Sequence, residues 1–92
     1  MATITIWRGF RSFVSQSDYE NVIFNGRELG SVRFESDVDI QYRIYETEEG
    51  EVLVHYVERN GYDCTAEIYE YESLEAAKAD YAFILRRAGV IK

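Results

Sequence analysis

Three runs of alternating apolar and polar residues occupy the middle of this 92-residue chain, and they constrain its fold more than any other feature. The runs cover residues 38–45, 52–57 and 62–69, and a period of two is typical of a half-buried strand. The breaks between them end in Gly50 and Gly61, as in three-residue hairpin loops whose glycine takes the left-handed conformation. The sequence therefore predicts three antiparallel strands joined by two tight hairpins.

The register of these strands follows from the length of the loops. A three-residue loop at 48–50 places Ile44 opposite Val54, and an equal loop at 59–61 places Val54 opposite Ala66. The apolar residues of all three strands then share one face. A two-residue turn at the second break would move the apolar residues of the third strand to the other face, so we expect the three-residue loop.

A helix is expected after the third strand. Ser73 is a suitable N-cap, Glu75 lies in the first turn where the helix dipole favours an anion, and Gly89 stands where a glycine ends a helix. We expect this helix to cover the apolar face of the sheet with one stripe of residues: Leu74, Ala77, Tyr81, Ile84, Leu85 and Ala88.

The first third of the chain is less regular. Residues 3–7 are expected to form a strand, and residues 22–24 and 31–35 two more, separated by an Asn-Gly pair. Residues 8–21 either continue the first strand or form a turn or short helix whose core-facing residues would be Phe10, Phe13 and Val14. We therefore expect a single domain over residues 1–92 of the α+β class: an antiparallel β-sheet meander of five or six strands packed against one C-terminal α-helix.

The composition excludes several classes of protein. Seventeen acidic residues against ten basic ones give a net charge of −7, which disfavours direct nucleic-acid binding because phosphates must be neutralised by Lys and Arg. No apolar run is long enough to span a membrane, and the first residues lack the features of a signal peptide. Cys64 is the only cysteine and has no internal partner for a disulfide. We expect a cytoplasmic protein, located in the host cytoplasm if it is encoded by a phage.

The acidic residues are unevenly distributed. Ten of them lie between positions 46 and 75, where Arg59 is the only base. The expected hairpins bring the first loop, the end of the third strand and the start of the helix to one end of the molecule, with Arg86, Arg87 and Lys92 near the other. This acidic end is either a solvated surface or a face that docks on a basic partner. Its members are Glu46, Glu48, Glu49, Glu51, Glu70, Glu72 and Glu75.

Residues capable of catalysis or metal binding are few. In the expected register His55 and Cys64 point to opposite faces, so we interpret Cys64 as a small core residue and His55 as a surface or partner-contact residue. No zinc or EF-hand spacing is present, and exposed hairpin carboxylates provide no acid–base cleft. The basic-aromatic segment at 8–11 could stack on a nucleic-acid base, but its two arginines stand against a net charge of −7 and do not favour this role. We predict that the protein is not an enzyme and has no cofactor.

The outward face of the sheet and the far side of the helix carry aromatic residues. Tyrosine is enriched at protein interfaces, and the face is expected to present Tyr45, Leu53, Val57, Tyr69 and Tyr71. These residues alternatively stiffen the sheet by cross-strand pairing, or are buried under the N-terminal segment. Phe83 lies opposite the helix stripe, where it either marks a self-association patch or packs against residues 8–21.

We predict that the protein is a small acidic inhibitor that occupies a basic, nucleic-acid-binding surface of a larger protein. The carboxylates of Glu46, Glu48, Glu49, Glu51, Glu70 and Glu72 would face partner Lys and Arg, and Tyr45, Tyr69 and Tyr71 would anchor beside them.

In size, acidity and sheet-plus-helix layout the whole chain resembles phage-encoded anti-defence proteins, including anti-CRISPR proteins. That resemblance implies binding to a CRISPR effector complex and exclusion of its target DNA.

Two other functions compete with this one. A non-catalytic interaction module or antitoxin-like regulator would act as a homodimer through Phe83 or a free sheet edge. A binder of a small ligand between sheet and helix would need a pocket of several hundred Å³, for which we expect the core to be too thin.

Overall fold

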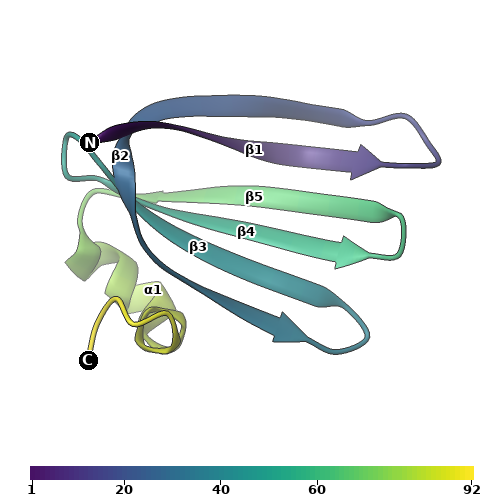
Figure 1. Ribbon diagram of the computed structural model, residues 1–92. Coiled ribbons are helices and arrows are strands. Elements are labelled where there is room, and N and C mark those ends of the chain that lie inside the picture. Colours follow the sequence, from purple (N-terminus) through teal and green to yellow (C-terminus); the bar gives the residue numbers. More distant parts are fainter.

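The computed structural model describes all 92 residues, which form five β-strands and one α-helix (Figure 1). Each strand pairs antiparallel with the next, and the first returns to pair with the fifth, so the sheet closes into a small barrel. The α+β class is confirmed, and the expected open meander is corrected to a closed barrel. The elements are β1 (Ala2–Ser12), β2 (Asp18–Glu35), β3 (Asp39–Thr47), β4 (Val52–Asn60), β5 (Asp63–Tyr71) and α1 (Leu74–Arg87).

The closure depends on β2, a single bent strand of 18 residues where the sequence predicts two separate strands. Its first half pairs with β1 and its second half with β3, and the exchange of partners takes place at Gly26. A Cβ at Gly26 would lie 2.3 Å from the Glu46 carbonyl oxygen. Gly26 therefore permits a close approach of two backbones, and the turn expected at this position does not form.

The undecided segment 8–21 is largely a β-hairpin. β1 continues to Ser12, and the chain turns back through residues 13–17 into β2. Phe13 and Val14 are exposed at this turn, by 86% and 70%, so they do not face the core. The alternative in which residues 8–11 extend the first strand is confirmed.

Of the two predicted hairpin registers, the first is confirmed and the second is wrong. Ile44 pairs with Val54 across a loop in which Gly50 donates a hydrogen bond to the Thr47 carbonyl oxygen at 2.9 Å. The second hairpin has a two-residue turn at Gly61-Tyr62, because Asn60 pairs directly with Asp63. Val54 is consequently opposite Tyr69, and every side chain of β5 points to the face opposite to the one expected.

Two hydrophobic cores result, one on each side of β3 and β4. Ile6, Tyr45 and Leu53 are buried inside the barrel. The outer core lies between the sheet and α1, and its buried members are Ile44, Val52, Val54, Ala77 and Leu85. β4 is therefore covered on both faces.

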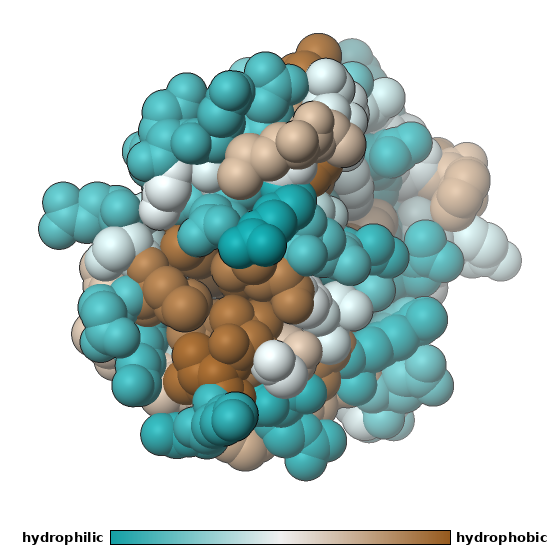
Figure 2. Space-filling model, turned by 60° about the vertical axis from the view of Figure 1, so that its left-hand side comes forward, coloured by the Kyte–Doolittle hydropathy of each residue, from teal (hydrophilic) through white to brown (hydrophobic).

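The helix forms as expected and covers the outside of the sheet. The Ser73 hydroxyl accepts a hydrogen bond from the Ala76 N–H at 3.1 Å, and Gly89 ends the helix with a φ of +78°. The helix bends at Tyr81, whose φ and ψ are non-helical. In Figure 2 a brown hydrophobic area is visible on the face turned forward, framed by hydrophilic residues. Partly buried aliphatic residues packed against the outer core are Leu29, Leu74, Ile84, Val90 and Ile91.

Candidate functional site

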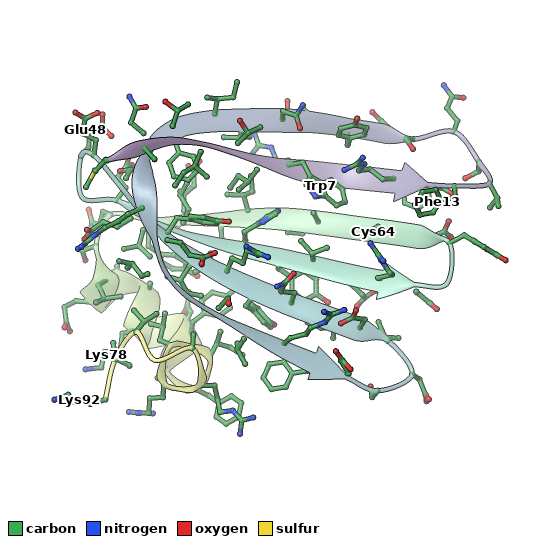
Figure 3. All side chains as sticks on the ribbon, viewed as in Figure 1. Trp7, Phe13, Glu48, Cys64, Lys78 and Lys92 are labelled. Atoms are coloured by element: carbon green, nitrogen blue, oxygen red, sulfur yellow. The ribbon has the colours of Figure 1, made fainter.

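The acidic end of the molecule is the first candidate site. Val52 pairs with Tyr71, so the loop before β4 and the segment after β5 lie side by side at the end of the barrel where α1 begins (Figure 1). Glu48 marks this end in Figure 3, and Phe13 marks the opposite end. Exposed carboxylates of this end with no Lys or Arg nitrogen within 4.0 Å belong to Glu48, Glu49, Glu51, Glu70, Glu72 and Glu75.

Glu46 is paired with an arginine, whereas the charge of Glu70 is felt by Arg8 only at longer range. Glu46 is half-buried and accepts hydrogen bonds from Arg27, with Nη2 at 2.9 Å from Oε1. The pKa of Arg8 is raised chiefly by its hydrogen bond to Glu20 and, to a lesser extent, by the nearby charges of Glu70 and Glu67. The remaining carboxylates of the set have no ion pair.

Of the bases expected away from the acidic end, Arg87 lies there, because Phe34 beside it pairs with Ile40 near the start of β3, whereas Lys92 does not. Lys92 lies toward the Glu48 end in Figure 3, because the chain turns back after Gly89 and packs Val90 and Ile91 against the outer core. The Arg87 guanidinium lies 5.9 Å from the centroids of both the Phe34 and Phe83 rings.

The tyrosines predicted as anchors lie in three different environments. Tyr45 is 6% exposed inside the barrel, with its ring 5.6 Å from that of Phe24, so the expected outward position is wrong. The Tyr71 hydroxyl donates to Asp80 Oδ2 at 2.8 Å, and burial followed by this hydrogen bond raises the pKa of Tyr71. Tyr69, 39% exposed, is the most accessible of the three.

The other residues of the expected outward face are also internal or partly buried. Leu53 is buried in the barrel core, which confirms the alternative of burial beneath the N-terminal strands for Leu53 and Tyr45. Val57 lies inside the barrel, on the wall of a cavity. Tyr69 and Tyr71 face α1 instead, because the two-residue turn reverses the faces of β5.

His55 is a buried structural residue, and its predicted surface position is wrong. The side chain is 5% exposed, and its Nε2 lies 2.7 Å from the carbonyl oxygen of Trp7 on β1. Because a carbonyl oxygen can only accept, Nε2 carries the proton. Burial lowers the pKa of His55; the hydrogen bond to Trp7 opposes this effect, and the neighbouring Arg43 charge adds to it. His55 therefore links β4 to β1 across the barrel interior.

A cavity of about 570 Å³ lies in the barrel toward the end opposite Glu48; no residue of α1 lines it, so it is not the pocket between sheet and helix that the sequence disfavours. Its wall includes the side chains of Trp7, Tyr19 and His55. Three arginines from three strands also line it: Arg11 of β1, Arg43 of β3 and Arg59 of β4. No aspartate or glutamate is part of the wall.

The three arginines are held in different ways. The Arg11 guanidinium lies 4.7 Å from the Tyr19 ring centroid and 5.2 Å from that of Trp7, in cation–π contact with both. Arg43 donates to Glu28 at 3.2 Å. Neither Arg11 nor Arg59 has a carboxylate oxygen within 4.0 Å. The cavity is therefore positively charged in a chain of net charge −7.

Cys64 lines the same cavity as His55, so the prediction that the two point to opposite faces is wrong. Cys64 is only partly buried and pairs with Arg59, four residues along β4 from His55. At the rise of a strand, this offset amounts to about 13 Å. No group of three or more His, Cys, Asp or Glu side chains is arranged to hold a metal ion.

Phe83 is the remaining candidate contact. It is 62% exposed, and its ring stacks on that of Phe34 of β2 at 6.4 Å, so its partner within the chain is not the segment 8–21.

Comparison with known proteins adds no further assignment. No family model matches the chain, and no match was found among curated proteins or solved structures. None of its helices has the length and apolar character needed to cross a membrane.

Proposed function

We propose that this protein is a non-catalytic inhibitor whose acidic end docks on a basic, nucleic-acid-binding surface of a larger protein. The observation that carries the proposal is the group of uncompensated carboxylates on two adjoining segments at one end of the barrel. Glu48, Glu49 and Glu51 come from the loop between β3 and β4, and Glu72 follows β5.

The electrostatics of this end favour a basic partner. Its exposed carboxylates lie on two adjoining segments, so their fields add toward a partner that approaches this end. A row of such charges resembles the phosphates that a nucleic-acid groove is built to neutralise. The short loop, held by the hydrogen bond from Thr47 N–H to the Glu51 carbonyl oxygen at 2.8 Å, presents three of them on a fixed support.

The contribution of tyrosines to docking is smaller than the sequence predicts. Tyr45 is inside the barrel, and Tyr71 is tied to Asp80, so neither can serve as an anchor without a change in the fold. Tyr69 remains available at the edge of the acidic end. We therefore assign most of the specificity to the carboxylates.

The resemblance to anti-CRISPR proteins makes a CRISPR effector complex the first partner to test. The experiment measures binding of labelled target DNA by a purified effector complex in the presence of the protein. Wild type is compared with a triple variant, Glu48→Lys, Glu49→Lys and Glu51→Lys. A matched control reverses three exposed acids elsewhere: Asp18→Lys, Asp37→Lys and Asp63→Lys.

The two triple variants have the same net charge, so they separate a local docking surface from overall acidity. We expect the control variant to displace DNA as wild type does and the loop variant to fail, with displacement by wild type weakening as salt rises. Equal inhibition by wild type and the loop variant would exclude the acidic-end mechanism. Absence of inhibition by wild type across the effector classes tested would exclude this partner.

A homodimeric interaction module is the second candidate, favoured by an incomplete seam in the barrel. β1 pairs with β5 only through residues 9–12, so residues 2–8 of β1 and 67–71 of β5 leave free strand edges along the seam. Free edges can pair with another chain. Sedimentation equilibrium tests this candidate, since a dimer has twice the 10.8 kDa mass of the chain. A monomeric mass at high concentration would remove it.

A further inference from the structure

We propose that the arginine-lined cavity is a binding site for a small organic anion that carries a planar ring, such as a nucleoside monophosphate or an aromatic carboxylate. This site lies at the opposite end of the barrel from the acidic end, and it does not depend on the docking function proposed above. The charges of the wall, its aromatic surface and one acceptor atom of His55 support the assignment.

The charges of the wall call for an anion. Arg11, Arg43 and Arg59 line the cavity from three strands, and only Arg43 is balanced by a carboxylate, that of Glu28 outside the cavity wall. Arg11 and Arg59 are free of ion pairs, whereas Arg8, Arg27 and Arg33 elsewhere on the barrel each have at least one. Guanidinium groups bind carboxylate and phosphate oxygens through paired hydrogen bonds, and a concave setting concentrates their field.

The aromatic surface calls for a flat ligand. Trp7 and Tyr19 meet edge to face, with centroids 5.9 Å apart, and the Arg11 guanidinium lies against both rings. The aromatic contacts fix the guanidinium in position before any ligand arrives, which reduces the entropy lost on binding. A cavity of about 570 Å³ is within the usual range for small-ligand sites and holds a ring as well as an anionic group.

An acceptor atom of His55 gives the site a means of orienting the ligand. His55 is 5% exposed and uses Nε2 to donate to the Trp7 carbonyl oxygen, so Nδ1 is the ring atom left to accept a hydrogen bond from the cavity. Its lowered pKa keeps the ring neutral, and this acceptor available, at neutral pH. A ligand with an amine or hydroxyl beside its ring would satisfy Nδ1 while its anionic group meets the arginines.

The proposal is tested by isothermal titration calorimetry on the full chain, with the fluorescence of Trp7 as a second signal. Trp7 is the only tryptophan and lies in the wall of the cavity, so a bound ring changes its emission directly. AMP and phenylacetate serve as probes with a phosphate and a carboxylate group. Adenosine and inorganic phosphate are the controls that each lack one half of the ligand.

We expect saturable binding of AMP, phenylacetate or both, at least tenfold tighter than that of adenosine or inorganic phosphate. The preferred probe identifies the anionic group. Equal binding of inorganic phosphate and AMP would overturn the assignment of a planar ring. Failure of both ring-bearing anions to bind at millimolar concentrations would overturn the site itself. A single-stranded RNA is titrated as well, and binding of this RNA without binding of AMP would likewise overturn the small-ligand site.

Arginine variants locate the binding. Arg59→Gln removes one guanidinium that makes no ion pair within the chain, and we expect roughly tenfold weaker binding from loss of a charge-assisted hydrogen bond. Arg11→Gln should weaken binding further and alter Trp7 emission in the free protein. The matched control is Arg86→Gln, which lies on α1 outside the cavity. Wild-type affinity in Arg59→Gln with unchanged circular dichroism, or an equal loss in Arg86→Gln, would refute the location.

Discussion

Replacing Gly26 with alanine tests the bent strand that closes the barrel. The added Cβ would lie 2.3 Å from the Glu46 carbonyl oxygen and 3.0 Å from the Phe24 ring. Non-bonded carbon contacts are most favourable at about 3.5–4.0 Å, so β2 and β3 must separate locally by about 1 Å. The nearby bond from Glu48 N–H to the Asn25 carbonyl oxygen, 2.8 Å long, cannot survive such a displacement.

Overpacking and the loss of this hydrogen bond together should lower the free energy of unfolding by about 3 kcal/mol. For a domain of this size the midpoint of thermal unfolding should fall by roughly 12–24 °C. Urea unfolding followed by Trp7 fluorescence measures the free energy, with Ser31→Ala as a control at an exposed position of the same strand. A loss below about 1 kcal/mol, no larger than that of the control, would refute the close approach at Gly26.

Two further predictions concern the cores. The pKa of His55 is lowered by burial, so the unfolded chain binds the proton more readily, and the folded protein should lose stability as the pH falls below about 6.5. His55→Gln retains an N–H donor for the Trp7 carbonyl oxygen but has no group that titrates in this range. In urea unfolding between pH 7 and pH 5, this variant should not show the loss of stability that wild type shows. An identical pH dependence in both proteins would contradict the buried, neutral His55. Leu85 is fully buried, so Leu85→Ala should reduce the free energy of unfolding by about 2–5 kcal/mol. Phe83→Ala, at a residue 62% exposed, should cost less than about 1 kcal/mol, and equal losses would show that α1 packs in another orientation.

The parts of the fold that could be predicted from sequence are those set by local patterns. Ser73 and Gly89 delimit the helix, and Gly50 fixes the first hairpin, because capping and left-handed turns depend on a few neighbouring residues. The second hairpin was mispredicted since Gly61 fits the left-handed position of either turn length. One residue of difference in the turn then reversed the faces of β5.

Long-range closure explains most of the other differences. The alternating pattern predicts that β4 is half-buried. The continuous apolar run Val52-Leu53-Val54 is the signal that both faces of this strand are covered. Asn25-Gly26 has the composition of a turn, and only the neighbouring backbone shows why glycine is needed. The cavity could not be predicted because Arg11, Arg43 and Arg59 come from three separate strands.

The acidic end was the more predictable of the two sites. Its carboxylates are close in sequence or joined by hairpins. They are therefore brought together with either length of the second turn, because the end of β5 reaches the loop before β4 in both cases. The prediction failed for Tyr45, whose position depends on β1 and β2 covering the inside of the sheet.

The pairing of β1 with β5 closes the barrel, and this closure forms the cavity and separates it from the acidic end. Formation of an engineered disulfide between these two strands tests the closure most directly. Arg11 pairs with Cys64 across this seam, and both side chains line the cavity. Directly opposed residues have Cα atoms about 4.5–5.5 Å apart, within the range that a disulfide spans. The variant Arg11→Cys should therefore oxidise to a monomer without free thiols, whereas Thr3→Cys, which pairs only with Asn25 of β2, should keep both thiols. Two free thiols, or only intermolecular crosslinks, in oxidised Arg11→Cys would contradict the closed barrel.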